Sequence, residues 1–358
     1  MLRTSLRASY WRFRLARWNR RPTTPEPGYT LLLPVPGDIP VFCELALKVC
    51  SRQAARHRRR TLVIPDRPSP TVTQLVEKTK PGWQGELEAV LLPRPERWFL
   101  PFMNSGSRNH GLQVVKGISV SSTSHVIFHD ADLFLLDDDF LDGQYETCRD
   151  RELECLGVSP VWDPWYETKG LRLAATWEMV ASVPWLRAFP PYRQIGHDGK
   201  LFGEVHTFDT TLYAQSLTPG YRVDWVDRSA DFVHFNYVIT AYRHFQRLGP
   251  GFVDDHFRLL LIALFVDLFS EESPPQGLPT LAELADGIGD AAAPVRYVRD
   301  EAHASRWAGF RAQLDRVLGA EYVAAPAAAE AVTALSAFDQ FYGAGAATGG
   351  SEDFGSLP

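Results

Sequence analysis

Two aspartates stand one residue apart in the segment HVIFHDADLFLL, directly after a run of apolar residues. In an extended backbone, residues two positions apart point to the same side, so the carboxylates of Asp130 and Asp132 converge. Converging carboxylates repel each other unless a cation lies between them, and Mg²⁺ and Mn²⁺ prefer such oxygen ligands. The pair therefore predicts a divalent-metal site. The alternative is a strand followed by an acidic, solvated loop.

A buried strand has to position this pair. Residues 125–128 contain Val, Ile and Phe, a composition that favours a buried strand. Because an unpaired carboxylate is costly to bury, we expect the strand to end at Phe128 or His129, with the aspartates at its carboxyl end. In α/β folds, ligands bind at this edge of the sheet. The three aspartates at 137–139 fit a solvated loop or the first turn of a short helix.

The first 135 residues alternate short apolar strands with amphipathic helices. The expected strands are 29–35, 61–64, 88–93 and 125–128, and the expected helices are 40–58, 72–79 and 109–121. This alternation predicts an α/β fold with a mostly parallel central sheet flanked by helices. Residues 153–162 predict a further strand, 203–227 predict helix, turn and strand, and helices are expected over most of 232–318. The apolar run at 259–269 is too short to span a bilayer and predicts a core helix.

Composition predicts an ordinary soluble protein, with 45% hydrophobic and 22% charged residues over 358 positions. The four cysteines show no C-x-x-C spacing, and the N-terminus lacks the apolar core of a signal peptide. Both features favour a cytoplasmic protein with unpaired thiols. We expect a basic leader at 1–27, a main domain at 28–250, a helical region at 251–342 that packs on it, and a disordered tail at 343–358.

Arginine is concentrated in the leader. The first 21 residues hold seven arginines and no acid, interleaved with aromatic residues. Basic and aromatic residues together suit an anionic membrane surface, so residues 1–21 predict a peripheral contact at the inner face of the membrane. An RNA contact and a disordered leader are the alternatives. The other basic run, at 56–60, is expected to end a helix, where cations favour the dipole, so no nucleic-acid partner is predicted.

Six motifs between residues 29 and 236 resemble, in order, those of GT-A fold glycosyltransferases of the family 2 type. They are LLLPVPGD, LVIPDR, NHGLQVVKGI, FHDADLFL, GEVHTFDTTLYAQSLTPGYRVDWV and DFVHFN. The resemblance implies a GT-A fold and transfer of a sugar from a nucleotide-sugar donor, taken as a UDP-sugar by base rate. It implies that Asp132 and His234 hold Mn²⁺ or Mg²⁺. It also implies donor contacts by Pro34, Val35, Asp66, Gly117 and Asp130.

The segment after the D-x-D strand departs from the family pattern, because its usual Glu-Asp pair is not intact. Glu204 and Asp209 are the candidates for the catalytic base of an inverting reaction, with Asp209 favoured by its place in DTTLYAQSLTPGYR. Trp165 and Trp162 are the expected contacts of a carbohydrate or lipid-linked acceptor, because sugar rings stack on aromatic faces. A catalytically inactive nucleotide-sugar-binding or scaffold protein and a nucleotidyltransferase remain as alternatives.

Overall fold

The structure is a computed structural model of the 358-residue chain. It describes residues 2–18, 24–97, 106–249, 256–270, 278–290, 292–293 and 295–343. The chain packs into two compact units. The first consists of Met1–Cys43, Gln53–Ala131 and Asp137–Asp231, and the second of Glu44–Arg52, Asp132–Leu136 and Phe232–Pro358. The predicted boundary near residue 250 is not tested by this division, and the predicted disordered tail lies almost wholly outside the described residues.

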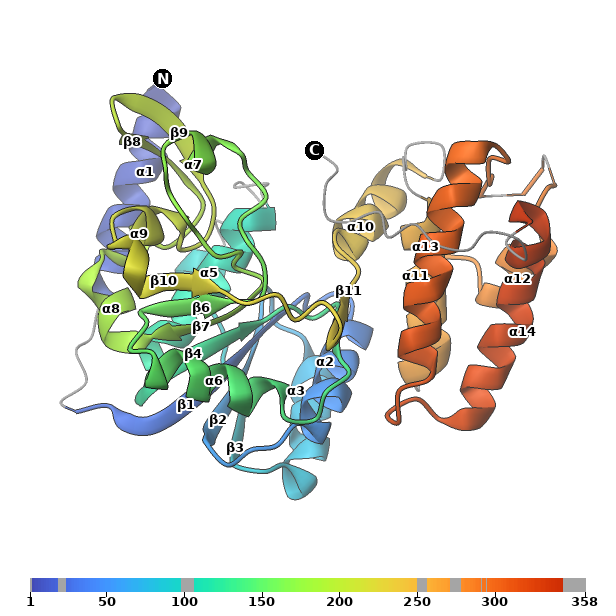
Figure 1. The fold of residues 1–358 in the computed structure, drawn as a ribbon, viewed down its shortest axis with the longest axis horizontal. Helices are drawn as coiled ribbons and strands as arrows, with labels where there is room; N and C mark the ends of the chain where they lie inside the picture. The colour runs from blue at the N-terminus through green and yellow to red at the C-terminus, as the bar shows by residue number, and fades with distance from the viewer. Residues whose placement is uncertain are drawn as a thin grey trace. The chain divides into compact units, whose positions relative to one another are not determined.

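The first unit is built around a sheet of seven strands in the order β10-β6-β7-β4-β1-β2-β3 (Figure 1). The pairs of β1 with β2, β1 with β4, β2 with β3, and β10 with β6 are parallel, whereas β7 runs antiparallel to both β4 and β6. The predicted α/β class with a mostly parallel sheet is therefore confirmed. The strands are β1 (Glu26–Val35), β2 (Arg58–Pro65), β3 (Glu86–Ala89), β4 (Thr123–His129), β6 (Cys155–Gly157), β7 (Glu178–Ser182) and β10 (Val223–Trp225).

Helices complete the first unit. They are α1 (Leu2–Leu15), η1 (Ala16–Trp18), α2 (Val41–Arg52), which continues into the second unit, α3 (Pro70–Thr79), η2 (Lys80–Gly82), α5 (Gly106–Val120), α6 (Phe140–Asp150), α7 (Trp165–Thr168), α8 (Val183–Ala188), η3 (Pro191–Arg193), α9 (Leu212–Ser216) and η4 (Gly220–Arg222). A hairpin of β8 (His197–Leu201) and β9 (Glu204–Phe208) stands apart from the sheet. All residues of β1 from Tyr29 to Val35 are buried, as expected of a parallel strand covered on both faces.

Gly117 shows how closely α5 approaches the sheet. A Cβ atom at this position would lie 2.7 Å from Leu32 Cδ2 and 2.9 Å from Ile64 Cδ1. Gly117 is therefore required by packing against β1 and β2, and its predicted donor contact stays a prediction.

Substitution of Gly117 by alanine should lower the free energy of unfolding by about 1–3 kcal/mol, because the added methyl overpacks a closed core. Gly143, in the interior of α6, is a matched control, since the nearest atom to a Cβ there is Arg228 Nη1 at 3.9 Å. Gly143→Ala should stabilise the protein by about 1 kcal/mol through helix propensity. Urea unfolding measures the free energy of unfolding of both variants. Equal changes in the two variants would contradict the packing argument.

Two predicted elements are corrected in the first unit. The helix predicted at 40–58 ends at Arg52, and Arg58–Arg60 begin β2 instead. The arginines suit this strand because Arg60 forms ion pairs with Glu86 and Glu88 of the neighbouring β3. The helix predicted to begin at 203 is a strand, β9, followed by the short helix α9.

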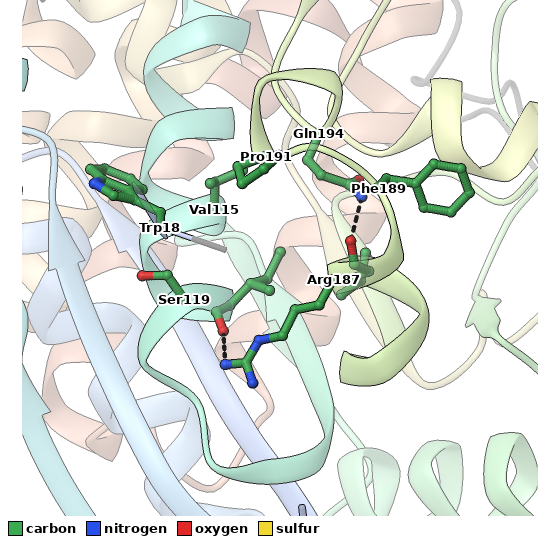
Figure 2. A pocket seen from close by; sticks show the side chains of 9 residues that line it. Trp18, Val115, Ser119, Arg187, Phe189, Pro191 and Gln194 are labelled. Atoms are coloured by element: carbon green, nitrogen blue, oxygen red, sulfur yellow. Dashed lines mark hydrogen bonds between the residues drawn. The ribbon is translucent and has the colours of Figure 1, made fainter. Parts of the chain in front are cut away.

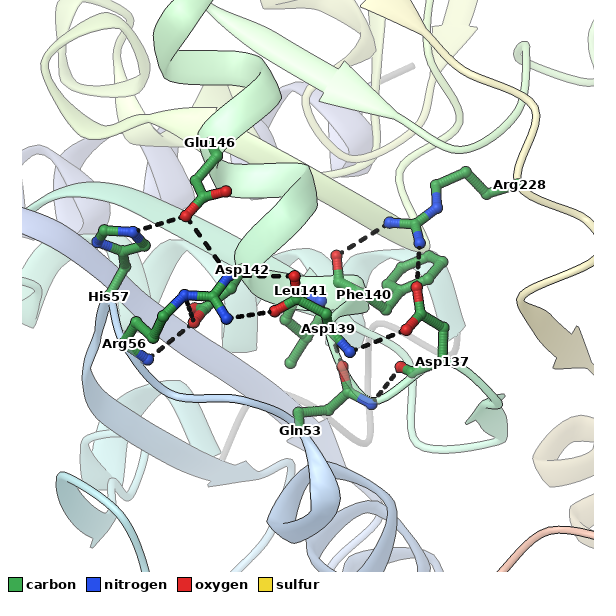
Figure 3. Close-up of polar contacts among 10 residues, drawn as sticks. All are labelled: Gln53, Arg56, His57, Asp137, Asp139, Phe140, Leu141, Asp142, Glu146 and Arg228. Atoms are coloured by element: carbon green, nitrogen blue, oxygen red, sulfur yellow. Dashed lines mark hydrogen bonds and ion pairs between the residues drawn. The ribbon is translucent and has the colours of Figure 1, made fainter.

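The acidic run at 137–139 has a structural role in the first unit. It forms the loop before α6, as one of the predicted alternatives requires (Figure 3). Asp137 pairs with Arg228 at 2.7 Å and Asp139 with Arg56 at 2.8 Å. Gln53 donates to the carbonyl oxygen of Asp137 and accepts from the backbone N–H of Leu141. These contacts anchor the start of α6, so this run is not part of the predicted metal site.

The N-terminal leader is helical over residues 2–18 and packs within the first unit. Trp11 and Leu15 are buried against a cluster of apolar residues, Leu92, Leu112, Val115, Tyr192 and Ile195. Beneath η1, Trp18 and Val115 line a cavity of about 10 Å³ that Gln194 and Arg187 also border (Figure 2). A space of this size holds no more than one water molecule.

Arg14 of α1 binds Glu96, a carboxylate with only 1% of its side chain exposed, through its Nε at 2.9 Å and its Nη2 at 2.8 Å. Arg14→Met should lower the free energy of unfolding by about 3–5 kcal/mol, because it leaves a buried charge without its cation. Arg17→Gln, an exposed change in η1, should alter stability by no more than about 0.5 kcal/mol. Chemical denaturation compares them. A mild effect of Arg14→Met would show that this ion pair contributes little to the stability of the fold.

The second unit is mostly helical and has an aromatic core. A two-stranded ribbon pairs β5 (Leu133–Leu135) antiparallel with β11 (Phe232–His234). The described helices are α10 (Val238–Leu248), α11 (His256–Phe269), α12 (Leu281–Asp286), α13 (Glu301–Leu318) and α14 (Ala325–Tyr342). The predicted core helix at 259–269 is confirmed within α11, and α14 lies inside the region expected to be helical at 251–342. Of the helices the structure describes, none combines the length and apolarity that a bilayer span requires.

Candidate metal and donor site

The ribbon of β5 and β11 brings Asp132 and His234 together. In its register, His234 lies opposite Leu133, the residue that follows Asp132. The distance from His234 Nε2 to Asp132 Oδ1 is 3.3 Å, and the backbone N–H of Phe235 donates to the carbonyl oxygen of Asp132 at 3.4 Å. Asp132 is buried, with 6% of its surface exposed. A backbone ladder therefore fixes a carboxylate beside an imidazole more than a hundred residues away in the chain.

Asp130 adds a third group to this pair. β4 ends at His129, as predicted, and Asp130, Ala131 and Asp132 form the connection to β5. A single residue, Ala131, separates Asp130 from Asp132 in the chain. One ligand atom from each of Asp130, Asp132 and His234 lies within 4.8 Å of the others. Two carboxylate oxygens and one imidazole nitrogen are a donor set that fits Mn²⁺ or Mg²⁺.

Two histidines of the first unit lie around Asp130. His110 of α5 places its Nε2 3.1 Å from Asp130 Oδ1, a contact that sequence reasoning missed. Its signal in the sequence is its place in the NHG segment, two residues before Leu112, the first leucine of the predicted helix. His129 is fully buried and its Nδ1 lies 2.7 Å from Glu178 Oε2 on the neighbouring strand β7. This buried pair holds the end of β4 against β7, directly before the Asp130 connection.

The residues predicted for donor binding at the first two strands lie at the same edge of the sheet. β1 ends at Val35 and β2 at Pro65, and Asp66 follows. Asp66 donates its backbone N–H to the carbonyl oxygen of Val35 at 3.1 Å, and its Oδ1 accepts from the N–H of Gly37 at 2.9 Å. Pro34, Val35 and Asp66 are all buried. Their geometry ties the two strand ends together, and their contact with a donor stays a prediction.

Glu204 lies on an exposed strand rather than on the predicted helix. Its Oε1 pairs with Lys169 Nζ at 2.8 Å, and its Oε2 accepts from Trp165 Nε1 at 3.0 Å. The hydrogen bond from Lys169, and then that from Trp165, hold the pKa of Glu204 below its usual range. Both oxygens have partners and the group is a weakened base, so this geometry supports a structural role better than a catalytic one.

Asp209 lies in the short connection between β9 and α9 and is half-buried. Its Oδ1 accepts from the backbone N–H of Thr210 at 2.7 Å. Thr210, the residue after Asp209, lies close to α5. A Cβ on Gly111 of that helix would be only 3.2 Å from Thr210 Oγ1. Gly111 directly follows His110, the residue beside Asp130. Close packing at Gly111 thus brings the Asp209 segment to the end of α5 that carries His110.

The two tryptophans predicted to contact an acceptor differ in their surroundings. Trp165 begins the short helix α7, not a loop, and stacks on His206 with ring centroids 3.9 Å apart and an interplanar angle of 6°. One face of Trp165 is therefore covered. His206 Nε2 lies 3.1 Å from Asp163 Oδ2. Trp162 is 51% exposed.

No protein-family model and no curated protein matches this sequence. Among solved structures, a fragment of TarS from S. aureus with UDP-GlcNAc is 13% identical, with 68% of each chain covered and a TM-score of 0.39. The mannosyltransferase PcManGT from Pyrobaculum calidifontis with GDP-Man and Mn²⁺ is 14% identical, with 92% of each chain covered and a TM-score of 0.40.

Glucosyl-3-phosphoglycerate synthase from Mycobacterium tuberculosis, solved with Mn²⁺ and UDP-glucose, is 12% identical. The match covers 46% of this chain and 61% of that one, with a TM-score of 0.33. The chain thus spans less than two thirds of this synthase. Similarities this low carry no inference about activity, so function has to be inferred from the sheet edge and its residues.

Proposed function

We propose that the protein is a metal-dependent glycosyltransferase that moves a sugar from a nucleotide-sugar, a UDP-sugar by base rate, to an acceptor hydroxyl. The observation that carries the proposal is the cluster of Asp130, Asp132 and His234 at the carboxyl end of the central strand β4. In sheets of this type that edge binds ligands. The motif order along the sequence supports the same assignment.

The chemistry needs charge neutralisation and a base. Asp132 and His234 would hold Mn²⁺ or Mg²⁺, which supplies Lewis-acid neutralisation of the departing diphosphate. Asp130 binds the ribose or the donor sugar. Asp66 binds the base of the nucleotide. Asp209 accepts the proton of the acceptor hydroxyl from the face opposite the leaving group, which inverts the anomeric configuration. Glu204 is the second candidate for this base, disfavoured by its contacts with Lys169 and Trp165.

The acceptor side is proposed to be a carbohydrate or a lipid-linked sugar. Trp162 offers an exposed aromatic surface. Trp165 can offer only the face that His206 leaves uncovered, so we place Trp162 first and Trp165 second in this role.

A screen of nucleotide-sugars for donor hydrolysis, with Mn²⁺ and with EDTA, tests the proposal. Hydrolysis of one donor that EDTA removes would support it, and the absence of hydrolysis of any donor would contradict a transferase. Metal-dependent binding without hydrolysis would instead favour a nucleotide-sugar-binding protein. The observation that favours a binding protein is the broken Glu-Asp pair: Phe208 stands directly before Asp209, where the family pattern has a glutamate.

A peripheral membrane contact at the inner face of a cytoplasmic membrane is proposed for the leader. The outward face of α1 and η1 carries Phe13, 64% exposed, with the Arg17 guanidinium 5.4 Å from its ring centre. Arg17→Gln should weaken sedimentation with phosphatidylglycerol vesicles about fivefold, since each cation near such a surface contributes about 1 kcal/mol. Arg247→Gln, an exposed change in α10, is the control. Sedimentation insensitive to salt would contradict the contact.

A further inference from the structure

A small cavity of the second unit lies beside His234. Its described lining consists of His234, Phe235, Asn236, Phe257, Arg258, Leu261, Phe310 and Gln313. The cavity holds about 20 Å³, which is room for one water-sized atom, such as a single oxygen of a phosphate or carboxylate, and not for a sugar ring. Any ligand that reaches it therefore enters only with a small terminal group.

The charge of this lining is one-sided. Among the described residues around the cavity, Arg258 carries the permanent charge and none is an aspartate or glutamate. Three phenylalanines and a leucine also line the cavity, and an apolar wall strengthens the attraction between a cation and an anion. Gln313 contributes a side-chain oxygen that is buried without a hydrogen-bond partner in the described structure. A half-turn of this amide would present its NH₂ group at the same place.

The guanidinium of Arg258 is held in a fixed orientation. Its Nε donates to the carbonyl oxygen of Asn236 at 2.6 Å, and its Cζ lies 5.3 Å from the centre of the Tyr237 ring. The planar guanidinium matches the geometry of carboxylate and phosphate oxygens, and an arginine fixed in advance loses less entropy when it binds them.

Tyr237 provides a separate sign that this segment is under functional constraint. It has φ +66°, a left-handed conformation that is unfavourable for a tyrosine, and its side chain is 52% exposed. Such strain persists only where the surrounding structure imposes it, and it is concentrated at ligand sites. Here the strained residue follows His234 by three positions and places its ring against Arg258.

We propose that Arg258, held by Asn236 and Tyr237, forms an oxyanion subsite beside the Asp132–His234 pair that takes a phosphate or carboxylate group of a ligand. This subsite rests on the proposed function, because it adds an anion contact to the proposed metal and donor site. The oxyanion comes either from the diphosphate of the donor or from an anionic acceptor. Its binding to Arg258 does not depend on sugar transfer, so the two proposals can fail separately.

The first experiment uses inorganic phosphate as the probe, without metal or nucleotide. The melting temperature of the full chain is measured against phosphate concentration, with potassium chloride keeping the ionic strength constant. Wild type should be stabilised as phosphate rises, and Arg258→Gln should weaken this apparent affinity about tenfold. Arg247→Gln removes the same charge from the exposed surface of α10 and should behave as wild type. Equal stabilisation of all three proteins, or none in wild type, overturns the subsite.

A conservative variant guards against a folding defect. Arg258→Lys keeps the charge and loses the planar fork, so it should bind phosphate several-fold more weakly than wild type. Unchanged affinity in this variant overturns the role of the guanidinium.

Calorimetry of UDP and of uridine, each with Mn²⁺, then shows whether the oxyanion comes from the donor diphosphate or from an anionic acceptor. If Arg258→Gln weakens UDP but not uridine, the subsite takes the donor diphosphate. If UDP binds equally to both proteins and phosphate still binds wild type in the presence of UDP, the subsite takes an anionic acceptor. Equal UDP affinity with displacement of phosphate by UDP in both proteins overturns the assignment to Arg258.

Discussion

Asp132→Asn should abolish the metal-dependent part of UDP binding. The substitution keeps the shape of the side chain but removes the charge that faces His234 Nε2 at 3.3 Å. Loss of an outer-shell partner weakens metal affinity about 10–100-fold, so removal of a direct ligand should weaken it by about 100-fold or more. His234→Gln should act in the same direction. Calorimetry of UDP with Mn²⁺ and with EDTA measures the effect, and with EDTA all these proteins should bind UDP alike.

A matched control comes from the same stretch of chain. Asp139 is about half exposed and pairs with Arg56. Asp139→Asn removes one carboxylate seven residues from Asp132 and should leave Mn²⁺-dependent UDP binding unchanged. If the Asp132 and Asp139 variants behave alike, general acidity near the strand end, and not a defined ligand, is responsible. If UDP binds equally to wild type and Asp132→Asn in Mn²⁺, there is no metal site at this pair.

The part of the candidate site that lies within one short segment could be predicted from the residues. Asp130 and Asp132 follow an apolar strand, and the cost of burying carboxylates places them at its end. His234 could not be derived in this way. Its position depends on a ribbon between segments about a hundred residues apart, and only the resemblance indicated it. The contacts of His110 and Glu178 also depend on tertiary packing that no local pattern shows.

The region at 203–227 shows why periodicity failed. Two left-handed residues, Phe202 with φ +51° and Gly203 with φ +84°, close a tight hairpin between β8 and β9. The strand β9 then ends at Phe208, and helix begins only at Leu212. A five-residue strand followed by a five-residue helix gives too few repeats to separate period 2 from period 3.6.

Charge patterns were also ambiguous where the partner lies in another element. The basic run at 56–60 predicts a helix end because the acidic partners of Arg60 lie on β3, more than twenty residues away. The cations and aromatic residues of the leader predict a surface contact, and the buried Glu96 that pairs with Arg14 gives no local signal. Arg14 therefore belongs to the fold, whereas Phe13 and Arg17 remain available for a surface contact.

The second large effect is expected for Asp209→Asn. Transfer should fall by about 10²–10⁴-fold, the usual contribution of a general base, while UDP and metal affinity stay unchanged. A base that acts on the acceptor proton contributes to the transition state and little to donor binding, so a fall in rate without a fall in affinity is the diagnostic result. Single-turnover transfer and UDP calorimetry on the same preparation separate the two quantities.

Glu204→Gln is the control for this assignment. It removes a carboxylate five residues away, whose oxygens contact Lys169 and Trp165, and it should change transfer much less. If Glu204→Gln is the crippling change and Asp209→Asn is mild, the base is Glu204, and its bond to Lys169 must break during catalysis. If neither change matters, the reaction either retains configuration or is not a transfer. NMR of the anomeric proton of the product decides between these, because an inverting enzyme with Asp209 as base must give the anomer opposite to that of the donor.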